Sequence, residues 1–141
     1  MIGDSLPTAI GDDLNGSIGT VPGTDSPGAT KFNEISKSNN FKAGPYTKES
    51  YDSAALIMLA MQAANSTNSN DFKSKVMDVA NAPGEKIFPG ELAKGLKLLS
   101  EGKEIDYVGA SAVELIGGGE SAGNFAEILI DNQKVTTVGY K

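Results

Sequence analysis

The sequence predicts an α/β fold. Between residues 27 and 101, apolar side chains recur at the three- and four-residue spacing of helices. After Tyr107 the pattern changes to short β-branched runs separated by glycines, which is typical of strands. The length of 141 residues is that of one ordinary domain. Because aromatic residues make up only 6% of the chain, its core must be built mainly from Ala, Leu, Ile and Val.

The first predicted elements are a short strand and a short helix. Residues 17–21 have the composition of a strand, and Pro22 closes it because proline cannot donate to a strand ladder. Pro27 suits the start of a helix. Within that helix Phe32 and Ile35 are three positions apart, so they share one face.

Residues 51–64 are predicted to form the central helix. Thr47 is a candidate N-cap residue ahead of it. Apart from Tyr51 itself, only Asp52, Ser53 and Gln62 are polar in this segment. The helix is therefore apolar around nearly its whole circumference, and we expect it to be buried on most sides.

Two further helices are predicted after a polar loop at residues 65–70. In residues 71–80, apolar side chains from Phe72 onward recur at i+4, i+7 and i+8, which indicates an amphipathic surface helix. Residues 89–101 begin with a proline, which suits the first helical position, and carry a stripe of leucines. Gly102 fits the position just after the end of that helix.

The remaining elements are predicted strands. Residues 111–116 and 125–131 are apolar and rich in β-branched side chains, and the glycines at 117–119 form a turn between them. A second turn at residues 132–133 leads to a last strand at 135–138. The sequence thus predicts about four helices and four strands.

Composition excludes several classes of function. Lys and Arg total 12 against 18 Asp and Glu, which gives a net charge of −6 and argues against binding to nucleic acid. Cys and His are both absent, which excludes thiol nucleophiles, zinc thiolate sites and histidine-assisted catalysis. Few classes of enzyme work when cysteine and histidine are both missing. We therefore predict no catalytic residues, no metal site and no cofactor.

The glycine run at residues 117–119 superficially fits a dinucleotide-binding fingerprint. That motif needs a helix immediately after the glycines, so that its amides face a pyrophosphate. The residues that follow alternate with period two, as Phe125, Glu127 and Leu129 do. A turn between strands is therefore the better interpretation.

Acidic residues suggest two further motifs, and neither is well supported. Asp12, Asp13 and Asn15 could begin a calcium loop, but its twelfth position is Gly23 instead of a glutamate. The acidic residues near position 104 could be a pair of catalytic carboxylates. They surround a predicted helix end, however, and a lysine lies among them, which favours an ordinary solvated surface. A hydrolase that uses only carboxylates for catalysis is kept as a third possible class of function, after a ligand-binding protein and a protein-interaction module.

The order of the sequence pieces carries a family resemblance. A Tyr-Asp-Ser-Ala-Ala helix start leads into an apolar helix and a polar loop. The later pieces are Gly-Glu-Lys-Ile at 84–87, Pro-Gly-Glu-Leu at 89–92, Leu-Leu at 98–99, Gly-Lys at 102–103, Ile-Asp-Tyr at 105–107 and Gly-Ala-Ser at 109–111. This series resembles the C-terminal third of type I periplasmic substrate-binding proteins of branched-chain amino-acid-type ABC transporters.

The resemblance implies a fold in which helices pack on a mixed, mostly parallel sheet. Members have two α/β lobes joined by three crossings, and they close on a ligand by hinge motion. It places the end of a second-lobe segment in residues 1–22, first-lobe structure mainly in 23–123, and strands returning to the second lobe in 124–141. Thr20, Val21 and Pro22 correspond to a hinge crossing.

Two ligand-binding residues are implied by the same resemblance. Asp4 matches a position where members commonly place an acid against the ammonium group of the ligand. Tyr51 matches an often aromatic position at the pocket mouth, where a ring can cover the ligand side chain. The alternatives are an ordinary loop aspartate and a core tyrosine, respectively. Ser5 follows Asp4 where many members have glycine.

The resemblance further implies a non-enzymatic, extracytoplasmic solute-binding component of an ABC importer, working in the periplasm or outside the cell. Its ligand would be an amino acid or a similar small polar molecule, and its partner a membrane permease. Typical members are more than twice as long, so we expect this chain alone to bind ligand weakly or not at all, and to self-associate through exposed apolar faces. The alternative is a small stand-alone α/β module that works through protein–protein contact.

Overall fold

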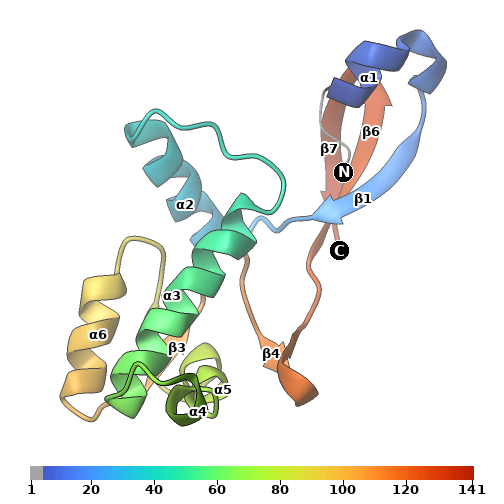
Figure 1. Ribbon diagram of the computed structural model, residues 1–141. Helices are drawn as coiled ribbons and strands as arrows, with labels where there is room; N and C mark the ends of the chain where they lie inside the picture. The colour runs from blue at the N-terminus through green and yellow to red at the C-terminus, as the bar shows by residue number, and fades with distance from the viewer. Residues whose placement is uncertain (1–4) are drawn as a thin grey trace. The chain divides into compact units, whose positions relative to one another are not determined.

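The computed structural model describes residues 5–141 (Figure 1). Helices follow one another between residues 27 and 80, and strands predominate after Tyr107, as the sequence predicts. The helices are α1 (Ser5–Ile10), α2 (Pro27–Ser38), α3 (Thr47–Ala64), α4 (Ser69–Phe72), α5 (Lys75–Ala80) and α6 (Leu92–Ser100), with short 3₁₀ turns at Asp12–Leu14 and Gly117–Gly119. The strands are β1 (Ile18–Pro22), β2 (Glu85–Ile87), β3 (Ile105–Tyr107), β4 (Leu115–Ile116), β5 (Glu120–Ser121), β6 (Phe125–Asp131) and β7 (Lys134–Tyr140).

The α/β class is confirmed, but strand pairing differs from the mostly parallel sheet that the resemblance implies. Among residues 5–141 only β2 and β3 pair in parallel. The sheet of order β1-β6-β7 and the hairpin β4–β5 are antiparallel. A two-residue turn at Asn132 and Gln133, both with positive φ, joins β6 to β7. Such a tight turn can only connect antiparallel neighbours.

The chain divides into two compact units. Unit 1 consists of Met1–Asp25, Gly44–Tyr46 and Gly123–Lys141. Unit 2 consists of Ser26–Ala43 and Thr47–Ala122.

Unit 1 is built on the three-stranded sheet. Its central strand, β6, buries Ala126, Ile128 and Ile130 on one face, as the period of two predicts. Helix α1 packs against β7. The other face of β6 carries Phe125 and Leu129, which are exposed and half-buried respectively.

Unit 2 is built around α3. Figure 1 shows α6 along one side of this helix and α4 and α5 near its carboxyl end. Ala55, Leu56, Leu59 and Ala60 are buried on α3, whereas Ile57, like the neighbouring Met58, is exposed. The central helix is therefore covered along one face and open on another, which is less burial than its composition predicts.

Three predicted elements of unit 2 have different limits in the structure. The helix expected over residues 71–80 is broken into α4 and α5 around Lys73 and Ser74. The helix expected from residue 89 begins at Leu92, because Pro89 and Gly90 form a turn. Gly102 does end that helix, with a φ of 73° and a hydrogen bond of 3.0 Å from the Lys103 amide to Leu98.

Residues 111–114 are not a strand. Ser111 and Ala112 belong to a turn, and Val113 and Glu114 have no regular secondary structure. The strand expected over 111–116 is reduced to β4, which pairs with β5 across the glycine turn. No helix follows those glycines, which agrees with the turn interpretation and leaves no dinucleotide fingerprint.

Candidate functional site

The carboxyl edge of the parallel pair β2–β3 is the candidate site in unit 2. It comprises two loops, residues 88–91 after β2 and residues 108–112 after β3. The Val108 amide donates to the Ile87 carbonyl at 3.0 Å, so the loops leave the strands side by side. In α/β folds, ligands bind outside the carboxyl ends of the parallel strands.

Asp52 anchors the loop after β3. Its carboxylate is only 2% exposed. One oxygen accepts from the Tyr107 hydroxyl at 2.9 Å and from the Ala110 amide at 2.7 Å. The other accepts from the Ser111 amide at 2.7 Å and from the Ser111 hydroxyl at 2.6 Å. Four donors therefore offset the cost of burying this charge.

Two glycines make room for this contact. Gly109 has a φ of 64°, and a Cβ there would lie 2.6 Å from the Asp52 carboxyl group. A Cβ on Gly28, at the start of α2, would overlap the Gly109 carbonyl oxygen. The loop after β3 can therefore approach α2 and α3 this closely only because both positions lack a side chain.

Tyr107 is held in its neutral form. Burial, and then the adjacent Asp52 carboxylate, raise the pKa of the Tyr107 hydroxyl well above its ordinary value. A hydroxyl that keeps its proton can serve as a permanent donor to Asp52.

Tyr51 anchors the other loop. Its hydroxyl accepts a hydrogen bond of 3.0 Å from the Gly90 amide. Its ring meets the ring of Phe32 edge to face, with centroids 5.2 Å apart. Tyr51 and Asp52, adjacent in the first turns of α3, thus hold one loop of the carboxyl edge each.

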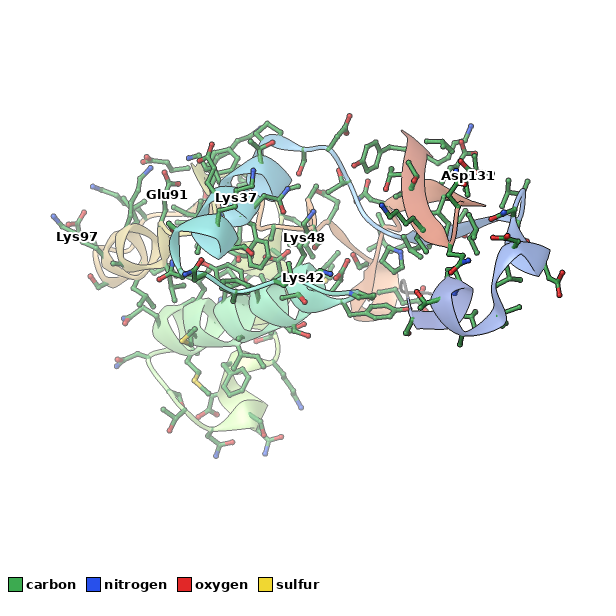
Figure 2. All side chains as sticks on the ribbon, turned by 90° about the horizontal axis from the view of Figure 1, so that it is seen from above. Lys37, Lys42, Lys48, Glu91, Lys97 and Asp131 are labelled. Atoms are coloured by element: carbon green, nitrogen blue, oxygen red, sulfur yellow. The ribbon has the colours of Figure 1, made fainter. Side chains whose placement is uncertain are left out.

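Glu91 closes the loop after β2 on itself. One carboxylate oxygen accepts from the Phe88 amide at 3.0 Å, and the other is paired with Lys31 of α2 at 3.2 Å. The Phe88 hydrogen bond, and then Lys31, hold the pKa of Glu91 below its ordinary value against an opposing effect of burial. Figure 2 shows Glu91 beside α2, and the Lys31 ammonium lies 4.4 Å from the centroid of the Phe88 ring.

Hydrogen bonds and ion pairs are the main polar contacts at this edge. Its charged and hydroxyl groups are engaged in holding the two loops. Among residues 5–141, no cluster of three or more acidic, His or Cys side chains could hold a metal ion. None of the described helices is long and apolar enough to cross a membrane.

A cleft of about 480 Å³ lies elsewhere in unit 2, beside the start of β3. Its lining includes buried core residues such as Val79 and Ile105. Both lysines on its rim are already paired, Lys75 with Asp78 at 3.0 Å and Lys103 with Glu101 at 2.7 Å. Nothing in this cleft singles out a ligand.

The sequence-predicted site residues have different outcomes. Asp4 lies outside the described residues. Tyr51 lies at the carboxyl edge, half-buried and engaged with Phe32 and Gly90. Thr20, Val21 and Pro22 lie in β1 of unit 1.

Asp52 is the anchor that sequence reasoning missed. The available signal was an acid placed in a helix that is otherwise almost entirely apolar, next to the singled-out tyrosine. A carboxylate in such a position must find donors or remain in water.

The fold is similar to that of a segment of a solved binding protein. The chain superposes on the crystal structure of the leucine-binding protein LivK from Thermotoga maritima with a TM-score of 0.68 and 16% sequence identity. The match covers 97% of this chain and 34% of LivK. This likeness establishes the fold.

Sequence comparison also finds similarity to a binding protein. Over 67 residues, 48% of its length, the chain is 30% identical to the chemotactic signal transduction system substrate-binding protein BasB of Halobacterium salinarum. That stretch is 16% of BasB, so the chain spans only a small part of either relative. No protein-family model matches the chain.

Proposed function

We propose that this chain is part of an extracytoplasmic solute-binding protein, which captures an amino acid or a similar small polar molecule without chemical change. The observation that carries the proposal is the fold likeness to a leucine-binding protein over nearly the whole chain. The sequence similarity to a substrate-binding protein supports it independently. Delivery of the solute to an ABC permease in the membrane is part of the same proposal.

The two units suggest how such a protein works. We assign unit 2 to one lobe and unit 1 to the other, with residues 20–22 as one of the crossings between them. The unit boundaries near residues 25 and 122 support this assignment, because they fall close to the ends of the segments 1–22, 23–123 and 124–141, although Gly44–Tyr46 of the middle segment belongs to unit 1. Ligand capture then requires one lobe to rotate toward the other about these short connections.

The carboxyl edge of β2–β3 is assigned to the ligand side of its lobe. Tyr51 belongs to this side in the proposal, and its ring covers the ligand side chain. Asp4 contributes the carboxylate that pairs with the ammonium group of the ligand. The hydrogen bonds that hold both edge loops support this assignment, since loops already in place reduce the entropy lost on binding.

The test is a thermal-shift titration of the whole polypeptide that the natural reading frame encodes. Amino acids, amides and aromatic acids are each added at millimolar concentration. A ligand at 100 times its dissociation constant stabilises the folded state by about 2.7 kcal/mol, which raises the unfolding midpoint visibly. The shift is expected with one ligand class.

Variants locate the site in the same experiment. Asp4→Ala should abolish the shift, whereas Asp13→Ala, which removes an exposed carboxylate of the 3₁₀ turn, should leave it unchanged. A cooperatively folded protein that responds to no member of the panel contradicts the proposed function.

A further inference from the structure

We propose that Met58 and Met61, on the outer face of α3, form a binding site for a soft monovalent metal cation, either Cu(I) or Ag(I). The proposed solute capture uses neither side chain, so this inference goes beyond that function and does not depend on it. Cysteine and histidine are absent from the chain, but methionines are present. Their thioether sulfurs are ligands that soft cations such as Cu(I) prefer.

The two methionines are neighbours on one face of α3. They are three positions apart in a continuous helix, which brings their side chains together. Leu59 and Ala60, which lie between them in the sequence, are fully buried in the core, whereas Met58 is 42% exposed and Met61 is half-buried. Both thioether groups are therefore on the outer side of the helix, where one cation from solution can contact them together.

Both methionines line an open hollow at the carboxyl end of α3. The rest of its lining is neutral and polar and consists of Gln62, Asn65, Ser66 and Thr67. Asn65 ends the helix in the left-handed region with a φ of 48°, and its amide donates to the Gln62 carbonyl at 3.1 Å. This helix end places amide and hydroxyl oxygens beside the two sulfurs, so a bound cation has additional neutral donors within the same hollow.

The electrostatics of this helix end favour a cation. The carboxyl end of a helix carries a partial negative charge, which a basic side chain in the last turn can offset. The last turn of α3 has no basic residue. The Asp71 carboxylate lies next to the hollow, since it accepts from the Ser66 hydroxyl at 2.7 Å. A monovalent cation bound to the two methionines supplies positive charge where the helix has none of its own.

The donor set determines which cations are bound. Mg²⁺ and Ca²⁺ require oxygen ligands, chiefly carboxylates, and neutral thioethers do not replace these. Zn²⁺ takes thiolate, imidazole and carboxylate ligands, and residues 5–141 contain no cluster of three or more such side chains that could hold it. Cu(I) and Ag(I) pair with polarisable sulfur, which Met58 and Met61 supply. The site is therefore expected to be selective for soft monovalent cations.

A silver titration of the whole encoded polypeptide tests the proposal. The methionine methyl groups carry isotope labels and are observed by NMR, and Ag(I) is added as the nitrate in chloride-free buffer. The methyl signals of Met58 and Met61 should shift along one common binding curve. Met77, which is half-buried on α5, should not shift over the same range and is the internal control. An excess of Mg²⁺ should leave the curve unchanged.

Matched variants locate the site. Met58→Leu and Met61→Leu keep the apolar volume of each side chain but remove its sulfur, so the fold is retained. Each should weaken Ag(I) binding at least about tenfold, because one of the two sulfur ligands is lost. Met77→Leu should bind Ag(I) as the original protein does. Gln62→Lys should also weaken binding, because an ammonium group then competes with the cation for this helix end.

Two outcomes overturn the inference. The first is a silver titration in which the methyl signals of Met58 and Met61 do not shift. The second is Ag(I) binding that either Met58→Leu or Met61→Leu leaves unchanged, which would place the metal on other ligands of the polypeptide. No solute is present in these measurements, and the thermal-shift panel contains no silver. Failure of this site and failure of the proposed function are therefore observed separately.

Discussion

The Tyr107 hydroxyl donates a hydrogen bond of 2.9 Å to the buried carboxylate of Asp52, and this contact joins β3 to α3 across 55 residues of sequence. Both side chains are at most 2% exposed. The same carboxylate holds the loop that follows β3. One side chain therefore links the central helix, the strand and the candidate ligand edge.

Asp52→Asn should destabilise unit 2 by about 2–4 kcal/mol, because the amide nitrogen of asparagine cannot accept from the donors that face it. Urea unfolding followed by circular dichroism measures the effect. Asp78→Asn is the matched control, since it removes only an exposed ion pair with Lys75 and should cost less than about 1 kcal/mol. Equal effects of the two variants would contradict the anchoring role of Asp52.

Gly109→Ala should be more harmful than Gly102→Ala. Both glycines have positive φ, 64° and 73°, so both substitutions carry a backbone cost of about 1–2 kcal/mol. A Cβ at Gly109 also meets the Asp52 carboxyl group, whereas one at Gly102 meets nothing within 4 Å. The difference between the two unfolding free energies isolates the steric contribution, and no difference would mean that the loop can move away from Asp52.

Elements that depend on local sequence could be predicted. The bounds of β6, Phe125–Asp131, were predictable because strict alternation buries one face of a seven-residue strand. The glycine turn and the helix start at Pro27 were equally plain, since both depend on local backbone chemistry. Such elements need no information about distant partners.

Elements defined by distant partners were not predictable in the same way. Strands β2 and β3 have only three residues each, too few for a period to appear in the sequence. Residues 111–114 have strand-like composition, but the Asp52 carboxylate draws the Ser111 amide into a turn. Likewise, the composition of α3 does not show that Ile57 is left exposed.

The stability of unit 2 should depend on the ionisation of Glu91. The pKa of Glu91 in the folded state is below its ordinary value, so its contribution is complete above the pKa of the unfolded chain and is lost as the pH falls through the folded pKa. Between about pH 5 and pH 3, the original chain should therefore lose more unfolding free energy than Glu91→Gln. Parallel pH dependences for the two proteins would show that the Phe88 and Lys31 contacts do not stabilise the charged form.

Tyr51 allows packing and ligand contact to be separated with two substitutions. Tyr51→Phe removes the acceptor for the Gly90 amide but keeps the ring on Phe32, so it should cost about 0.5–1.5 kcal/mol of stability. Tyr51→Ala also removes the ring and should cost more, about 1.5–3 kcal/mol, because the ring is only half-buried. In the whole polypeptide, a ring that covers the ligand predicts nearly unchanged affinity for Tyr51→Phe and a loss of at least about tenfold for Tyr51→Ala, measured by calorimetry at a temperature where both variants are folded. If Tyr51→Ala binds as tightly as the original protein, Tyr51 is a packing residue of unit 2 and the ligand lies elsewhere.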